Sequence, residues 1–337
     1  MLSLLRRTER GLILAACAGL LLCARSFAAP PMDVSFVKQT DHLDIRIGDR
    51  VVATYVFADP EIPRPYFCNV MTMNGTRVTR NHPPDPVANK DNDDHAGYHP
   101  GLWLAFGDIN GNDFWRNKAR VRHVSIQELP GDSPNTRRFS VVNRYESTET
   151  PGAAICEETC VYSIRAEEDA YFIVCESELR ALDTDVAFGD QEEMGFGLRL
   201  NTPLTVKFGT GTIVNSAGGA NEKGTWGKTA EWCAGIGRVD NGQVGAMLMP
   251  DPRNFRPSWF HSRDYGLIVA NPFAKKAMTA PDDDQTPPDS TRVATGKTLR
   301  IGFGVCIFEH PASSSPGLTG FYDTYLESIG MGADSRN

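Results

Sequence analysis

Hydrophobic and polar residues alternate along most of this chain, in short runs separated by Gly, Pro, Asn and Asp. Alternation with a period of two predicts β-strands that bury one face. Gly48-Asp49 between two such runs indicates a hairpin turn, and Glu167 to Asp169 indicates another. We predict strands at 34–36, 42–47, 51–57, 121–128, 138–145, 155–165, 171–182, 195–201, 244–249, 266–269 and 298–308.

Helical periodicity is nearly absent, and only residues 317–329 predict a short amphipathic helix. Many strands joined by long Gly- and Pro-rich connections are typical of a β-sandwich. We therefore expect an all-β fold, a single large antiparallel β-sandwich with long site-forming loops and little helix, over residues 30–337. No shift in composition and no internal repeat indicates a second domain.

Two long segments lack the strand pattern. Residues 60–100 are rich in Pro, Asn and Asp, and this segment is too long for a passive connector, so we interpret it as a site-forming loop. Residues 274–295 include Asp282 to Asp284, which predicts a solvated excursion. A calcium-binding aspartate cluster is the alternative, although the spacing of an EF-hand is missing.

The N-terminus has the pattern of a secretory signal. Arg6, Arg7 and Arg10 precede an apolar run over residues 11–23, and small residues follow up to Ala29. We expect residues 1–29 to be removed on export to the periplasm or beyond. The alternative is a lipoprotein box at residues 14–17, which would attach the protein to a membrane through Cys17.

The charge of the chain is −8 and its basic residues are scattered, which excludes a nucleic-acid-binding face. Export permits disulfide bonds, and we expect at least one. The preferred pair is Cys156 with Cys175, because their strands flank the turn at 167–169. The cysteines that follow the signal are Cys68, Cys156, Cys160, Cys175, Cys233 and Cys306.

The segment 93–117, DDHAGYHPGLWLAFGDINGNDFWRN, combines two histidines, four aspartates and two tryptophans. An imidazole can act as acid, base or metal ligand near neutral pH. Indoles beside carboxylates and amides are typical of sugar sites, because the ring covers a pyranose face while oxygens hold hydroxyls. The structural alternative is a surface loop in which His95 and His99 form hydrogen bonds that stabilise the loop.

Two further motifs carry candidate chemistry. In SWFHSRDYG an extended strand would place His261, Arg263 and Tyr265 on one face, with Asp264 on the other. We expect the segments 60–117 and 254–273 to meet at one rim of the sandwich. Carboxylates lie in glycine-bounded loops at GDQEEMGFG and GGANEKGTWG, and glycosidases need two carboxyl groups.

Several long motifs follow one another in a characteristic order. They are RPYF at 64–67, NHPPD at 81–85, DHA at 94–96, HPGLWLAFGD at 99–108, ANE at 220–222 and SWFHSRDYGLIVANPF at 258–273. Together they resemble the DUF6807 family of exported bacterial proteins, over roughly residues 43–309. The resemblance implies a β-rich exported domain, often encoded near sugar oxidoreductases and glycan-degrading enzymes.

Members of that family are often labelled methane oxygenase PmoA, a name that belongs to an integral membrane protein. No apolar run after the signal is long enough to span a membrane, so we do not expect methane oxidation. Many relatives carry a tighter histidine cluster after the first Asp-His. Here residues 96–98 separate His95 from His99, so an exact metal geometry does not transfer.

We expect an exported carbohydrate-active enzyme that performs hydrolysis or elimination on a glycoside or oxidised sugar by His/carboxylate acid–base catalysis. The alternative is a non-catalytic glycan-binding β-sandwich. The catalytic candidates are His95, His99, His261, Glu193, Glu222 and Asp264. The candidates for binding a small molecule or oligosaccharide are Arg64, His82, Trp103, Asp108, Trp115, Asn221, Trp226, Arg263 and Tyr265.

No cofactor is firmly implied by the sequence. A dinucleotide is excluded because no GxGxxG motif lies between a strand and a helix. A divalent metal is an alternative, with ligands drawn from His82, Asp94, His95, His99 and His261. The His-x3-His spacing supports it only weakly, since Gly97 and Pro100 disfavour the helix that would align the two rings.

Overall fold

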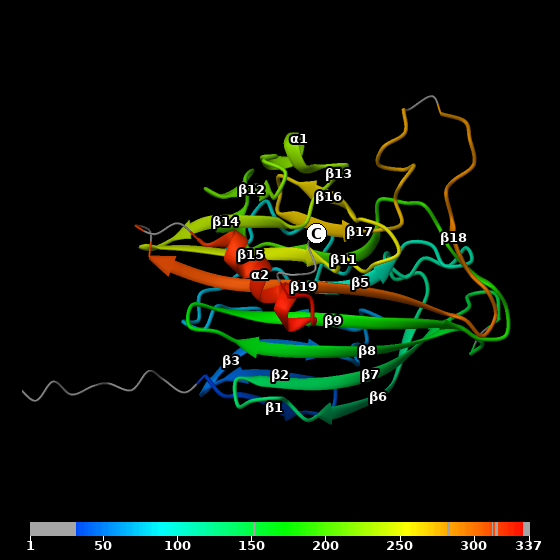
Figure 1. Cartoon of the computed structure of the whole chain (residues 1–337), viewed down its shortest axis with the longest axis horizontal. Coiled ribbons are helices and arrows are strands. Elements are labelled where there is room, and N and C mark those ends of the chain that lie inside the picture. The colour runs from blue at the N-terminus through cyan, green and yellow to red at the C-terminus, as the bar shows by residue number, and fades with distance from the viewer. Residues whose placement is uncertain (1–31, 151, 282–283, 312, 314–315, 333–337) are drawn as a thin grey trace, which may run out of the picture. The chain divides into compact units, whose positions relative to one another are not determined.

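A computed structural model describes residues 32–150, 152–281, 284–311, 313 and 316–332. The expected signal at 1–29 and the lipoprotein alternative at Cys17 lie outside the described residues. Within the described chain, two large antiparallel sheets carry nearly all of the regular structure (Figure 1). The predicted all-β sandwich is confirmed.

The first sheet has nine strands. The candidate site lies on the outer face of this sheet, which is turned away from the second sheet. In spatial order the strands are β1 (Val34–Lys38), β2 (His42–Ile47), β3 (Arg50–Val56), β4 (Tyr66–Cys68), β5 (Leu102–Phe106), β11 (Met194–Arg199), β17 (Leu267–Asn271), β16 (Trp259–Arg263) and β13 (Lys228–Thr229).

The second sheet has eight strands. In spatial order they are β12 (Thr212–Asn215), β14 (Cys233–Val239), β15 (Gly242–Pro250), β19 (Thr298–Pro311), β9 (Ala170–Ala181), β8 (Ala154–Ala166), β7 (Thr136–Glu146) and β6 (Val121–Leu129). A small two-stranded sheet pairs β10 (Val186–Phe188) with β18 (Thr291–Val293).

Helix is confined to short elements. The predicted helix at 317–329 is present as α2 (Leu318–Ser328), which packs through Tyr322, Tyr325 and Leu326 on the second sheet. The other two elements are α1 (Asn221–Thr225) and the 3₁₀ helix η1 (Thr202–Leu204). Among the described residues, no helix is long and apolar enough to cross a membrane.

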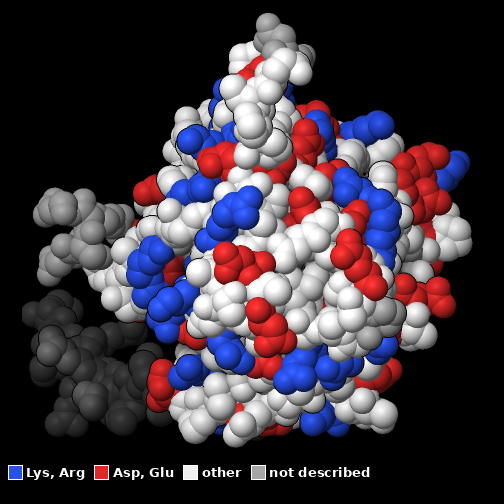
Figure 2. Space-filling view, turned by 90° about the vertical axis from the view of Figure 1, so that its right-hand side faces the viewer, with Lys and Arg blue, Asp and Glu red and all other residues white. Residues whose placement is uncertain are grey.

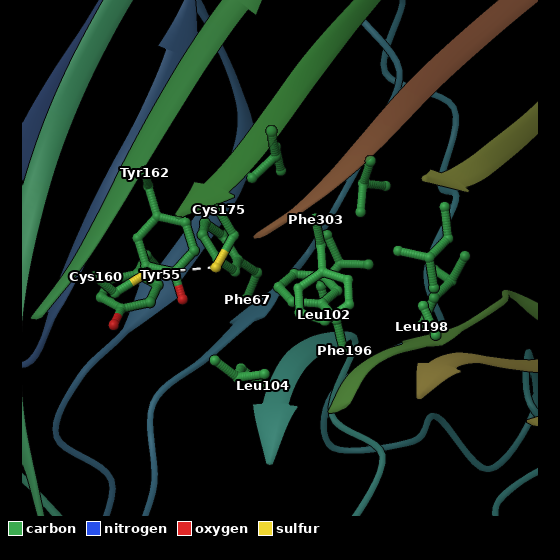
Figure 3. Close-up of a cluster of buried hydrophobic side chains, with 14 of the residues drawn as sticks. Tyr55, Phe67, Leu102, Leu104, Cys160, Tyr162, Cys175, Phe196, Leu198 and Phe303 are labelled. Carbon is green, nitrogen blue, oxygen red and sulfur yellow. Dashed lines mark hydrogen bonds between the residues drawn. The ribbon is translucent and has the colours of Figure 1, made fainter. Parts of the chain in front are cut away.

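The core lies between the two sheets and follows the alternation seen in the sequence. Tyr55, Phe67 and Phe196 of the first sheet meet Tyr162 and Phe303 of the second (Figure 3). Acidic and basic side chains are interspersed on the face shown in Figure 2.

The predicted disulfide between Cys156 and Cys175 is wrong. Strands β8 and β9 place Cys156 opposite Ala181 and Cys175 opposite Tyr162, so the two thiols are far apart in register. All six cysteines in the described chain are free and buried. The sulfurs that do meet are those of Cys160 and Cys175, whose Sγ atoms lie 3.3 Å apart (Figure 3).

We predict that the first disulfide to form under oxidation joins Cys160 to Cys175, because a bond of about 2 Å needs only a small approach of these sulfurs. Peptide mapping without reductant, after refolding with oxidised glutathione, checks the pairing. Cys160→Ser should abolish the bridge and Cys156→Ser should leave it intact. A bridge that contains Cys156 would contradict this register.

Candidate functional site

The outer face of the first sheet brings distant parts of the chain together. Strands β5, β11, β17 and β16 are neighbours, and their register aligns Trp103, Gly197, Val269 and His261 in one row. Because directly paired residues point to the same face of a sheet, Trp103 and His261 share this face. The segments 93–117 and 259–265 therefore meet, on a sheet face rather than at the expected rim.

A glycine lets the indole of Trp103 lie flat against the sheet. A Cβ atom at Gly197 would lie 2.5 Å from Cε2 and Cζ2 of Trp103. The Trp103 and Trp115 rings lie 5.4 Å apart at 75°, and both residues are only 1% exposed. Both indoles are packing groups here, which differs from the expectation that they offer an open stacking surface.

Two buried arginines hold the loop that carries the histidines. Arg199 Nη2 donates to Asn92 Oδ1 at 2.6 Å and to Asp94 Oδ1 at 2.5 Å. Arg80 Nη1 donates to the backbone oxygens of Asn92 and Asp94 at 2.8 and 2.7 Å. Burial lowers the pKa of Arg80 to about 10, which leaves the guanidinium charged at neutral pH. The loop is thus fixed to the sheet by charge-assisted bonds.

His99 is a buried, neutral imidazole. Its Nδ1 lies 3.2 Å from Arg199 Nη1, and its ring stacks on Trp103 at 5.1 Å and 12°. Burial, with the charge of Arg199 second, holds the pKa of His99 well below its usual range. Since a guanidinium can only donate, Nδ1 is the acceptor and the ring proton sits on Nε2.

His95 is the exposed histidine of the loop. Its Nδ1 lies 2.5 Å from Asp94 Oδ2, its side chain is 51% exposed, and its backbone has φ = 52°. Burial raises the pKa of Asp94, but Arg199 and the bond from His95 outweigh it and the pKa is lowered. The ionised carboxylate accepts a hydrogen bond from Nδ1–H of His95, which leaves Nε2 as the nitrogen with the free lone pair. The His95 ring lies 5.3 Å from that of His99.

His261 has both ring nitrogens occupied. Nδ1 donates to the backbone oxygen of Glu192 at 3.2 Å, and Nε2 accepts from Arg263 Nε at 3.1 Å. Burial lowers the pKa of His261, so the ring is neutral. With no nitrogen left for a ligand, His261 is better placed to position Arg263 than to transfer protons.

Arg263 is paired with two neighbouring acids. Nη1 donates to Glu222 Oε1 at 2.9 Å and Nη2 to Glu192 Oε2 at 3.0 Å, while its Cζ lies 5.6 Å from the Trp226 ring centre. Burial raises the pKa of Glu222, but the Asp264 N–H and Arg263 outweigh it and the pKa is lowered. The guanidinium is therefore committed to internal carboxylates rather than free to clamp an anion.

Asp264 is a structural residue at the start of α1. The Glu222 N–H donates to Asp264 Oδ1 at 2.8 Å, and the Asp264 N–H donates to Glu222 Oε2 at 3.1 Å. This reciprocal pair fixes the short helix against β16. A catalytic role for Asp264, which we expected, has no support in this arrangement.

Tyr265 joins the two histidine clusters. The guanidinium carbon of Arg199 lies 4.3 Å from the centre of the Tyr265 ring. Burial raises the pKa of Tyr265, and the charges of Arg199, Asp94, Arg263 and Glu222 all act on it. Tyr265 therefore lies between charged groups of the His95/His99 cluster and charged groups of the His261/Arg263 cluster.

The remaining candidates lie at the edges of the site or outside it. Glu193 pairs with Arg116 at 2.8 Å. Arg64 donates to the Tyr98 backbone oxygen at 2.5 Å, and its Cζ lies 5.7 Å from the Trp103 ring. Both groups border the site.

Three candidates have structural surroundings instead. His82 packs edge-on against Tyr66 at 5.1 Å. Asp108 accepts from the Gly111 N–H at 2.7 Å within a turn, and Asn221 accepts from the Ile213 N–H at 3.1 Å. The geometry gives Asp108 and Asn221 turn-stabilising roles rather than the ligand contacts expected of them.

A divalent metal has no ready set of ligands. No group of three or more His, Cys, Asp or Glu side chains in the described part of the chain is arranged to hold one. The proposed ligands already have other partners, since His99 Nδ1 faces Arg199 and Asp94 binds two arginines.

The residues that the sequence missed are Asp94 as an orienting group, together with Arg80 and Arg199. A signal for Arg199 exists, because it is the one charged residue in the apolar strand 194–199. A charge at an alternating position of such a strand must face a polar partner. The identity of that partner depends on the strand order, which the sequence does not contain.

We predict that the neutral His99 makes stability depend on pH. The pKa of His99 in the folded protein lies below its value of about 6.5 in the unfolded chain. As the pH falls below about 6.5, the unfolded chain binds a proton at His99 and the folded protein does not, so the free energy of unfolding decreases. From pH 7.5 to 5.5 the wild type should lose about 1 kcal/mol more unfolding free energy than His99→Gln. Urea unfolding at both pH values measures this, with exposed His95→Gln as the control. Equal losses in wild type and His99→Gln would contradict a neutral His99.

A second prediction concerns the glycine under Trp103. Gly197→Ala should destabilise the fold by about 1–3 kcal/mol, because the new methyl group displaces the indole. Gly320→Ala, where no atom lies within 4 Å, is the matched control and should cause no loss. Thermal unfolding measures both, and equal stability of the two variants would be inconsistent with the tight contact.

Comparison with known proteins places the chain in a family. No curated protein matches it. Solved structures with a similar arrangement include the galactosidase domain of alpha-galactosidase-sucrose kinase AgaSK (12% identity, TM-score 0.33, 84% of this chain and 41% of that one). Others are a galactose mutarotase related enzyme from Lactobacillus acidophilus (9%, 0.35, 84% and 99%) and a putative mutarotase from Salmonella typhimurium (12%, 0.31, 82% and 94%).

The family profile described as a family of unknown function, DUF6807, matches residues 42–316. That match covers most of the described chain and includes every motif of the site. The chain belongs to the DUF6807 family.

Proposed function

We propose that this protein is a carbohydrate-active enzyme that moves a proton on a glycoside or an oxidised sugar, with His95 as the base. The observation that carries the proposal is the Asp94–His95 pair, an exposed imidazole oriented by an ionised carboxylate. A carboxylate on Nδ1 fixes the tautomer and leaves Nε2 free to accept a proton. Arg199 and Arg80 keep that carboxylate charged and in place.

His99 complements this base. It is neutral with its proton on Nε2, and its ring lies 5.3 Å from that of His95. A neutral N–H donor beside a base suits a reaction in which negative charge develops on a sugar oxygen while a proton leaves carbon or oxygen. Arg199 behind the ring adds positive potential to the same place.

The carboxylates favour elimination over hydrolysis within this class. Hydrolysis by a pair of carboxyl groups needs one acid with a raised pKa. Here the pKa values of Asp94 and Glu222 are both lowered, and Glu192, Glu193 and Glu222 each contact an arginine. Carboxylates held by arginines suit the binding of sugar hydroxyls. We therefore assign Glu193 and Glu222 to binding.

A non-catalytic glycan-binding module is the second candidate. Its support is the ion-paired character of the surface around Arg263 together with the half-buried Trp226, which offers a ring beside hydroxyl acceptors. This candidate requires sugar binding without turnover. Turnover of a sugar substrate would distinguish the enzyme from the binding module.

We also propose export of the mature chain to the periplasm or beyond, from the basic and apolar pattern of residues 1–29. Membrane attachment would then arise only through lipidation of Cys17. N-terminal sequencing of the protein from its native cells distinguishes a mature chain that starts near Pro30 from one that starts at a modified Cys17.

The reaction is tested by screening glycosides and their keto derivatives for release of reducing sugar or loss of carbonyl. With a substrate in hand, His95→Ala should lower kcat by about 10²- to 10⁴-fold with a small change in KM, as expected for a general base. Trp226→Ala should raise KM instead. The matched control is His42→Ala, since His42 Nδ1 contacts Asp41 at 2.7 Å in a similar Asp-His pair outside the site.

Wild-type kcat in a folded His95→Ala protein would remove His95 from the mechanism. Binding of glycans with no turnover of any of these substrates would favour the binding module.

A further inference from the structure

A cavity of about 480 Å³ opens beside the candidate site, between the segment after β3 and the start of β6. Its lining includes Phe57, Asp59, Arg64, Arg120, Arg122 and His123. A cavity of this size accommodates a monosaccharide. None of the roles proposed above uses it, apart from the single bond between Arg64 and the loop oxygen of Tyr98.

Positive charge dominates the lining. Arg64 is 3% exposed, and its Nε and Nη1 have no hydrogen-bond partner among the described residues. Burial of Arg64 lowers its pKa to about 9, so it still carries its charge at neutral pH. A buried cation without a carboxylate partner is costly, and an anion nearby would offset that cost.

The other two arginines are accessible at the opening. Arg120 is exposed, and no ion pair to its side chain is present in the described chain. Arg122 uses Nε to bind Glu146 at 2.7 Å, which leaves its terminal nitrogens available. Two guanidinium groups one residue apart can hold a carboxylate through charge-assisted hydrogen bonds.

The carboxylates in and beside the cavity already have hydrogen-bond donors or a cation as partners. The Asp59 carboxylate accepts from the backbone N–H groups of Glu61 and Ile62 at 2.7 and 3.0 Å, and from the Tyr66 hydroxyl at 2.5 Å. With three donors it attracts cations weakly, and its remaining lone pair suits a hydroxyl. Glu146 is balanced by Arg122. The three arginines therefore exceed the two carboxylates in charge.

Two aromatic rings that pack against each other also line the cavity. The rings of Phe57 and His123 lie 4.7 Å apart at 35°, and His123 Nδ1 faces Asn143 Oδ1 at 3.3 Å. Burial lowers the pKa of His123, so this ring is neutral and acts as an apolar surface. Flat rings favour the C–H face of a pyranose.

We infer that this cavity is a second binding site, for a monosaccharide acid of the hexuronate class. The carboxylate would lie between Arg120 and Arg122 near Arg64, with the sugar ring against the outer side of the Phe57–His123 pair and a hydroxyl at Asp59. The inference is independent of the reaction proposed for the His95 site, because the two use different side chains.

The test is calorimetric titration of the whole mature protein with D-glucuronate, with D-glucose and acetate as the matched probes. Glucuronate should bind saturably, and glucose and acetate should each bind at least about tenfold more weakly, since one lacks the charge and the other lacks the ring. The combined Arg120→Gln and Arg122→Gln variant should weaken glucuronate binding about tenfold or more. Arg300→Gln, an 80% exposed arginine on β19, should leave it unchanged.

Because Arg120 is exposed, Arg120→Gln alone keeps the test valid if the double variant fails to fold, and it should weaken binding by about threefold or more. Absence of saturable glucuronate binding, equal binding of glucose, or unchanged binding in the folded arginine variants would each overturn the inference. Glucuronate binding that His95→Ala abolishes and the arginine variants retain would place the ligand in the first site instead.

Discussion

The buried guanidinium of Arg199 is the group on which the site depends. It lies on the outer face of an apolar strand, where a charge needs partners, and it finds Asn92, Asp94 and His99 in one loop and the Tyr265 ring in another. Those contacts fix the loop on the sheet, keep Asp94 ionised and keep His99 neutral. A long Pro- and Asn-rich segment thereby holds a defined set of acid–base groups without regular structure of its own.

The alternation of apolar residues was sufficient to predict the sandwich and most long strands, including 138–145 and 171–182, because a half-buried strand repeats every two residues. Strand β14 (Cys233–Val239) escaped prediction, since its glycines conceal the alternation. The Cys156–Cys175 pairing failed for a different reason. The turn was placed correctly, but the register across it pairs Cys156 with Ala181 and Cys175 with Tyr162. The two cysteines therefore lie at different distances from the turn and do not face each other.

The sequence predicted the location of the site better than the roles of its residues. Clustered His, Asp and Trp residues identified the loop and the 258–265 motif, and the structure brings them onto one sheet face. Differences in burial and in hydrogen bonding then give these candidate residues different roles. Trp103 and Trp115 became packing groups, His261 lost both nitrogens to internal bonds, and His95 kept one free. Such differences arise from contacts between strands distant in sequence, which no local pattern records.

Burial and the charge of Arg199 together keep His99 neutral, and the tautomer of its imidazole tests this most directly. Long-range ¹H–¹⁵N NMR spectra report which ring nitrogen carries the proton. We predict that His99 stays in the neutral Nε2–H form as the pH falls through about 6.5, the usual pKa of an imidazole. Arg199→Met should raise the pKa of His99 and leave it below that usual value, because the ring remains buried. A His99 ring protonated on Nδ1, or one that titrates at about pH 6.5 with Arg199 in place, would contradict a buried neutral His99.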